Sequence, residues 1–299
     1  MAKANALEWG FFMGFETYYS ECATCRQTRS CIIGAAGGMA PMDESARAVV
    51  EVVEAGNGIA ETSRSGQLVG VLRSGLMRLD RVDARGRRHM LGLVLPGEPV
   101  GELLPTGSSA HAVTALVTSR VCRFDDDRGT DYSRFLPQVR HRLLSSYSVR
   151  LARLQSILWI RASLSVNARV AALLLMASRF MRTSPLADGA ILLTSVLPRH
   201  DAAELLGTTV ESFCRALHVL ENEGLIVIRD SRRFELRDVA GLERLSALDG
   251  AYLDKLFPCG RSRKPLRSRR AAATGLHAPP ALVARRARSR STTVTEPIR

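Results

Sequence analysis

The spacing of apolar residues changes near residue 137, and this change constrains the fold more than any other feature of the sequence. Before it, short apolar runs over residues 67–104 are broken by Ser-Gly, Asp-Ala-Arg-Gly and Pro-Gly. Met77 and Leu79 alternate with charged residues, which is the period of a half-buried strand. Since the Gly-bearing breaks suit hairpins, the sequence predicts antiparallel β structure here, with a second β stretch over residues 112–124.

Beyond residue 137 the apolar residues recur at alternating steps of three and four, as in the seam of a coiled coil. This pattern predicts a long helix over residues 137–160. Its seam consists of Leu144, Tyr147, Leu151, Leu154, Leu158 and Arg161, while Arg150, Arg153 and Gln155 lie off the seam. Two interpretations remain open: the seam pairs with a second copy of the chain, or the helix packs on its own β domain.

The region after the long helix has the outline of a DNA-binding motif. The stretch "RHDAAELL" (residues 199–206) predicts a short helix, Gly207 breaks it, and a second helix opens at Thr208 and ends at Gly224. A short helix, a Gly-containing turn and a second helix form the helix-turn-helix outline. The following "LIVIRDSRRFELRD" predicts two strands around a basic turn. Together these segments predict a winged helix-turn-helix.

The predicted second helix places Glu211, Cys214 and Arg215 on one face, because they lie at positions i, i+3 and i+4. In the major groove, Arg215 could donate two hydrogen bonds to guanine and Glu211 could accept one from cytosine. Two ordinary roles also fit: Glu211 as the capping-box partner of Thr208, and Glu211 with Arg215 as a surface ion pair. The preceding turn and the basic wing favour base readout. The predicted DNA contacts are Thr209, Glu211, Ser212, Cys214, Arg215, Arg232 and Arg233.

The segment "ECATCRQTRSC" places three of the chain's six cysteines within ten residues. The N-terminus lacks the features of a signal peptide, and no run approaches the roughly 18 apolar residues of a spanning helix, so we expect a cytoplasmic protein without a membrane partner. Disulfides are rare there, so Cys22, Cys25 and Cys31 indicate a thiolate site. Three chemistries are open: an iron–sulfur cluster, a zinc site, for which only Cys22 and Cys25 have the usual spacing, and a C-x-x-C thiol switch.

The order of these parts resembles the CRP/FNR family of transcription regulators, over about residues 15–250. The cysteine segment, spaced C-x2-C-x5-C, is similar to the N-terminal motif of the FNR branch, and the distant fourth cysteine of that motif falls at Cys122. The resemblance implies that Cys22, Cys25, Cys31 and Cys122 hold an oxygen-labile four-iron four-sulfur (4Fe-4S) cluster. It also implies that the intact cluster promotes homodimerisation and DNA binding.

The second helix gives another point of resemblance. FNR-type recognition helices carry V-E-x-x-S-R, and this chain has Val210 and Glu211 followed, after two residues, by Cys214 and Arg215. The resemblance implies palindromic TTGAT-like operators in double-stranded DNA, with RNA polymerase as a further partner. Cys214 departs from the family serine, and because a thiol is a weak donor and acceptor, we expect its DNA contact to weaken or change.

A second departure concerns cyclic nucleotides. Family members that bind them follow Gly-Glu-Leu with an Arg-Ser/Thr-Ala phosphate cradle, whereas Gly101-Glu102-Leu103 precedes "LPTGSSAHA" here, with Ser109 at the position expected for the arginine. No cation is left there to neutralise a cyclic phosphate, so we do not expect a cyclic nucleotide. The alternatives to oxygen sensing are a CRP-like regulator with a zinc or thiol-switch site, or a cyclic-nucleotide-binding module. Since the sequence lacks G-x-G-x-x-G, Walker A, H-E-x-x-H and G-x-S-x-G, an enzyme is not expected.

The sequence therefore predicts an α+β fold with an N-terminal antiparallel β-roll like that of cyclic-nucleotide-binding domains, a long dimerisation helix and a C-terminal winged helix-turn-helix. The predicted division is a cysteine-bearing segment at 1–43, a β-roll sensor domain at 44–136, a dimerisation helix and connector at 137–182, a DNA-binding domain at 183–258 and a basic tail at 259–299. The chain has a net charge of +13, and most of it comes from the tail, which has 11 basic residues and one acid. We expect the tail to be disordered. It could contact phosphates loosely or be a solvated appendage. Cys259 in the tail has no role in this scheme.

Overall fold

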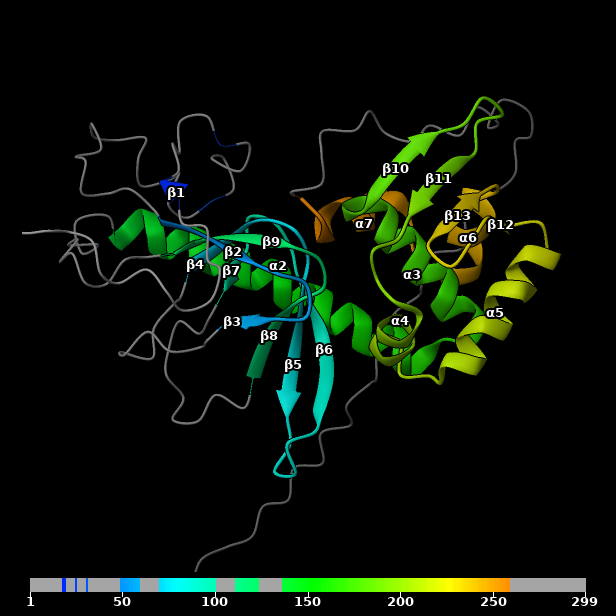
Figure 1. Ribbon diagram of the computed structural model, residues 1–299. Helices are drawn as coiled ribbons and strands as arrows, with labels where there is room; N and C mark the ends of the chain where they lie inside the picture. The colour runs from blue at the N-terminus through cyan, green and yellow to red at the C-terminus, as the bar shows by residue number, and fades with distance from the viewer. Residues whose placement is uncertain are drawn as a thin grey trace, which may run out of the picture. The chain divides into compact units, whose positions relative to one another are not determined.

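The computed structural model describes residues 18–19, 25, 31, 49–59, 70–100, 111–123 and 136–258 (Figure 1). The predicted basic tail, Cys22 and the Gly101–Ser109 region lie outside these ranges, as does Cys259. In the described part of the chain, no helix is both long enough and apolar enough to span a bilayer.

The N-terminal part is a pair of antiparallel sheets, as the alternating pattern predicts (Figure 1). The first has the strand order β1-β2-β9-β4-β7 and the second the order β3-β8-β5-β6. The strands are β1 (Tyr18–Tyr19), β2 (Val49–Val53), β3 (Gly58–Ile59), β4 (Gly70–Ser74), β5 (Met77–Val82), β6 (Arg88–Val94), β7 (Pro99–Val100), β8 (His111–Ala115) and β9 (Ser119–Arg123). The predicted β stretch over residues 112–124 is thus two strands in different sheets. A core that includes Leu72, Met77 and Val121 joins the two sheets.

The long helix α2 (Leu136–Ser163) confirms the predicted change of period. One face of α2 packs on the β-roll: Arg153 donates to the Glu98 carboxylate, and Arg150 donates to the Pro99 carbonyl at 2.6 Å. All three of these charged residues are more than 90% buried. The opposite face exposes the seam leucines Leu144, Leu151 and Leu158, which are 63%, 56% and 66% exposed. The helix therefore packs on its own β domain with one face, where the seam residue Leu154 is half-buried against Gly92 of β6, and leaves the other three seam leucines exposed.

The C-terminal part contains five helices and a third antiparallel sheet, of order β10-β11-β13-β12, within residues 164–258. Its elements are α3 (Val166–Phe180), β10 (Arg182–Pro185), β11 (Ile191–Thr194), α4 (Arg199–Leu205), α5 (Val210–Asn222), β12 (Ile226–Ile228), β13 (Arg233–Leu236), α6 (Val239–Ser246) and α7 (Gly250–Leu256). Helices α4 and α5 with strands β12 and β13 confirm the winged helix-turn-helix. Helix α3, whose side chains are buried almost all round, forms the core on which α5 and α6 pack.

Candidate functional site

The turn between α4 and α5 is built around Gly207. Its φ is +63°, in the left-handed region that favours glycine. A Cβ added there would lie 2.6 Å from Nε of the exposed Arg161 side chain, which would have to move to admit it. Arg169 donates to the carbonyls of Leu206 and Gly207 at 3.3 and 3.4 Å. The turn is thus fixed by the backbone conformation of Gly207 and by Arg169, which sets the direction in which α5 leaves α4.

Helix α5 begins one residue later than the sequence predicts. Its N-cap is Thr209, whose side chain accepts a hydrogen bond from the Ser212 backbone N–H at 3.2 Å. The alternative role of Glu211 as the capping-box partner of Thr208 therefore does not apply, because Thr209 is the N-cap. Thr208 lies before the cap, in the turn that ends α4, where its backbone N–H donates to the Ala203 carbonyl at 3.0 Å.

The first turns of α5 present a polar, exposed face. Arg215 donates to Glu211 at 2.9 Å through Nη1 and to the Ser212 hydroxyl at 3.3 Å through Nη2. The side chains of Arg215 and Glu211 are 69% and 76% exposed. The structure thus brings together four of the predicted DNA contacts on one face, with Thr209 donating to the Ser212 hydroxyl at 3.0 Å.

Cys214 lies apart from that face. It is half-buried, packs against the main hydrophobic core, and its sulfur accepts a hydrogen bond from Nη1 of Arg199 at 3.4 Å. Arg199 is the first residue of α4, so the thiol sits between the two helices of the motif. The DNA contact of Cys214 therefore stays a prediction, and sequence spacing gave no sign of its Arg199 partner.

The wing is held by charged pairs on β13 and its turn. Glu235, buried on β13, lies 2.5 Å from both Arg229 and Arg237, and the hydrogen bond from Arg229 is the main reason that the Glu235 pKa is lowered. At the turn, Asp230 accepts from the Arg232 and Arg233 backbones and from Nε of Arg233 at 2.5 Å. Because these bonds favour the ionised form, the Asp230 pKa is lowered too. The Arg232 side chain is exposed, whereas the Arg233 charge is shared with Asp230.

The described cysteines of the predicted cluster site lie at sheltered positions. Cys31 and Cys122 are buried, at 8% and 7% exposed, and Cys25 is half-buried. Cys122 is on β9, where it aligns with Val50 of β2 and Val71 of β4. A side chain at the neighbouring Gly70 would bring its Cβ within 2.2 Å of the Cys122 carbonyl oxygen, so β4 passes very close to this cysteine.

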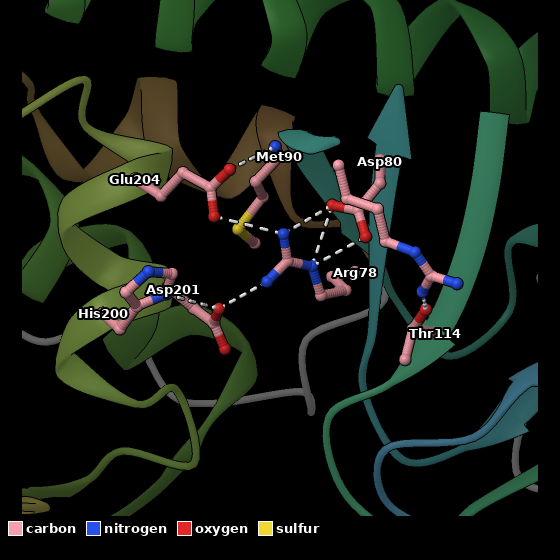
Figure 2. Close-up of polar contacts among 8 residues, drawn as sticks. Arg78, Asp80, Met90, Thr114, His200, Asp201 and Glu204 are labelled. Atoms are coloured by element: carbon pink, nitrogen blue, oxygen red, sulfur yellow. Dashed lines mark hydrogen bonds and ion pairs between the residues drawn. The ribbon is translucent and has the colours of Figure 1, made fainter. Parts of the chain in front are cut away.

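Sequence reasoning missed one group of charged residues. Arg78 and Asp80 follow the alternation of a half-buried strand, which suggests a solvent-facing side for β5. They instead face α4, where Arg78 meets Asp201 and Glu204 (Figure 2). No sequence signal joins positions more than 120 residues apart, although "DAAE" on α4 does place two acids three residues apart, on one helix face.

Comparison with known proteins extends these observations. A family model described as a Crp-like helix-turn-helix domain matches residues 168–245. The nitrogen fixation regulation protein FixK of Azorhizobium caulinodans is 31% identical over 220 residues, covering 69% of this chain and 85% of that protein. The cyclic AMP receptor protein of Thermus thermophilus is 32% identical over 184 residues, covering 60% of this chain and 80% of that protein. The structure of FixK2 from Bradyrhizobium japonicum shares the fold, with a TM-score of 0.54 at 22% identity, covering 68% of this chain and 99% of that one.

The matched domain and the fold both indicate the same protein family. The helix-turn-helix of α4 and α5 lies inside the region matched by the Crp-like model. The relatives similar over most of their own length are transcription regulators rather than enzymes. The chain therefore belongs to the CRP/FNR family of transcription regulators.

Proposed function

We propose that this chain is an oxygen-responsive DNA-binding regulator, in which a 4Fe-4S cluster on the four predicted cysteine ligands controls dimerisation and binding to palindromic TTGAT-like operators. The observation that carries the proposal is an alignment across the first sheet. Tyr18 of β1, Val50 of β2 and Cys122 of β9 lie in one row of the ladder.

This alignment makes the distant cysteine reachable. Because neighbouring strands lie about 4.8 Å apart, the Tyr18 and Cys122 backbones are about 10 Å apart. Cys22 follows Tyr18 by four residues, and four extended residues span roughly 13 Å. The chain leaving β1 is thus long enough to bring the N-terminal cysteines to Cys122, which supports a shared site.

The chemistry of the described donors also suits a cluster. Cysteine thiolates are its usual ligands, and solvent exposure is one of the factors that tune its potential. Cys31 and Cys122 are buried and Cys25 is half-buried, so these thiols are sheltered from water. A bound cluster would supply the oxygen-labile group, while the chain supplies the four ligands and, through Cys122, a direct covalent link to β9.

The exposed seam of α2 supports the homodimer. Leu144, Leu151 and Leu158 recur every seven residues and are all more than half exposed in the single chain. A heptad of exposed leucines gains most by packing on an identical heptad, which is the geometry of a parallel two-stranded coiled coil. We therefore place the two-fold axis of the dimer along this seam.

The exposed face of α5 supports direct readout of bases. Arg215 and Glu211 pair with each other at 2.9 Å. Exposed pairs of this kind contribute only about 0–1 kcal/mol, so exchanging the pair for base contacts costs little. Arg215 suits guanine and Glu211 suits cytosine, while Thr209 and Ser212, at the start of the helix, suit phosphate or base edges.

The wing and the flanking arginines supply contacts that do not depend on sequence. Arg232 and Arg233 are both exposed at the wing turn. Since the Arg233 charge is shared with Asp230 at 2.5 Å, we assign Arg232 the larger part in phosphate binding. RNA polymerase is the further partner that a regulator of this class would contact.

Anaerobic reconstitution tests the proposal. Protein incubated with iron and sulfide should gain an absorbance near about 400 nm that bleaches in air, and Cys122→Ser should prevent it. Cys259→Ser, outside the proposed ligand set, is the matched control. Stoichiometric zinc without colour would favour the zinc regulator, and an air-driven loss of two thiols without metal would favour the thiol switch. DNA binding that requires added cyclic AMP would instead favour a regulator that responds to cyclic AMP, the ligand in the name of the Thermus relative.

A further inference from the structure

Arg78 on β5 connects the β-roll to the first helix of the DNA-binding motif. It donates to Asp201 at 2.5 Å and to Glu204 at 3.1 Å, both on α4, and to Asp80 on its own strand at 2.8 Å (Figure 2). One guanidinium thus serves three carboxylates from two separate parts of the fold. We name Arg78, Asp80, Asp201 and Glu204 the roll–helix clamp.

The clamp is shielded from water, so its charges interact strongly. The Asp80 side chain is fully buried, and those of Arg78, Asp201 and Glu204 are 14%, 11% and 25% exposed. Burial alone would lower the Arg78 pKa, but the hydrogen bond to Asp80 and the three carboxylate charges outweigh it, and the Arg78 pKa is raised. Arg78 therefore stays charged at any physiological pH and remains a donor to the carboxylates on both sides of the contact.

The neighbouring strand adds a backbone bond to the same helix. The Met90 N–H on β6 donates to Glu204 at 2.8 Å (Figure 2). The register of β5 and β6 shifts at this point: Leu79 pairs with Gly92, but Asp80 pairs with Met90, so β6 has one extra residue. Bulges of this kind redirect a strand and its side chains. Here the bulge lies beside the edge N–H that reaches α4.

The β-roll is also fastened to the dimerisation helix. Glu98, in the turn before β7, accepts from Arg153 of α2, and Arg150 lies 3.5 Å from the same carboxylate. The β-roll therefore contacts α2 through Glu98 and α4 through Arg78. In a two-fold dimer built on α2, these two contacts determine where each recognition helix lies relative to the two-fold axis.

We propose that the roll–helix clamp fixes the distance between the two recognition helices, and so selects the half-site spacing of the operator. The proposal rests on the DNA-binding dimer proposed above. It makes Arg78, Asp201 and Glu204 positioning residues: they touch no DNA, and they act by holding α4 against the β-roll. A change in the β-roll would reach α5 through this contact, because the short turn at Gly207, bonded to Arg169 through its carbonyls, joins α4 directly to α5.

The test uses a double substitution on the helix side, Asp201→Asn with Glu204→Gln. It removes both charges that Arg78 meets on α4, while the buried Asp80 keeps its Arg78 partner and the side-chain amide oxygen introduced by Glu204→Gln can still accept from the Met90 N–H. The matched control is Asp83→Asn, which removes a half-buried carboxylate that pairs with Arg87 in the same hairpin and is not among the carboxylates that Arg78 meets. Arg78→Lys, which keeps the charge but lacks the fork needed for several carboxylates, serves if the double variant does not fold.

The measurement is anaerobic titration of full-length protein with duplexes whose half-sites are moved in single base-pair steps around the preferred spacing. Wild type and the control should prefer one spacing sharply. In the double variant this preference should fall about fivefold or more, the lower end of ordinary site coupling, while affinity for an isolated half-site stays unchanged. An equally sharp profile in the double variant overturns the clamp proposal alone. Wild type that prefers no palindrome over random DNA overturns the proposed function instead.

Discussion

Replacing Leu151 by glutamate is the strongest perturbation of the proposed dimer. Leu151 is 56% exposed and lies at the middle of the seam. Full burial of a leucine contributes about 1.5–3 kcal/mol, so covering the exposed 56% of this side chain contributes about 0.8–1.7 kcal/mol per protomer. A two-fold dimer loses that contribution twice, about 1.7–3.4 kcal/mol, and gains two facing carboxylates. At about 1.4 kcal/mol per factor of ten, the dimer Kd should rise roughly 15- to 300-fold before repulsion is added.

Sedimentation equilibrium of the anaerobically reconstituted protein measures this change. The control is Ser145→Glu, an exposed residue on the same helix that lies off the heptad seam. It adds the same charge to each protomer and should leave the dimer Kd within a factor of two or three. Equal Kd values for Leu151→Glu and the unaltered chain would show that the protomers meet elsewhere, and the seam would then be an exposed apolar face of another kind.

Three further predictions follow from the described contacts. Arg215→Ala should relax specificity at one guanine by about 1–3 kcal/mol, whereas Arg232→Ala should weaken all sequences alike and reduce the salt slope of log K by about 1; fluorescence anisotropy over base-substituted duplexes separates the two. Cys214→Ser should raise affinity for a TTGAT-type palindrome if that position reads DNA, and unchanged anaerobic titrations would assign Cys214 to the contact with Arg199 instead. The Asp83 carboxylate accepts hydrogen bonds, chiefly from the Arg87 backbone N–H, which lower its pKa to about 2. The stability that ionised Asp83 gives to the hairpin should be complete above about pH 4 and should be lost as the pH falls through about 2. The Arg87 amide resonance should therefore titrate near about 2 rather than near the ordinary carboxyl value of 3.8.

The parts of this fold that local chemistry determines could be read from the sequence. Alternation around Met77, the heptads around Leu151 and the glycine at position 207 each act within a few residues of the chain, and the strands, the helix and the turn formed there. Helix α3 was not predicted, because its sequence carries no such local pattern. It is apolar on nearly every side, so it has no amphipathic period to detect.

The contacts that link distant segments could not be predicted in this way. The alternation of Arg78 and Asp80 marks one side of β5 as polar, but only the folded chain shows that this side meets α4 rather than water. Likewise, the spacing predicted that Cys214 and Arg215 share one face of α5. Neighbouring residues of a helix point about 100° apart, and in the structure Arg215 is exposed while Cys214 is half-buried beside Arg199.

The measurement closest to the central claim is DNA retention by one reconstituted sample, assayed without oxygen and again after exposure to air, alongside its absorbance spectrum. We predict that the chain retains a TTGAT-type palindrome while the absorbance near about 400 nm persists, and that both are lost together in air. The Cys122→Ser protein should show neither property in either condition. Retention that survives complete bleaching, or that is undiminished in Cys122→Ser, would contradict an oxygen-labile cluster as the switch for DNA binding.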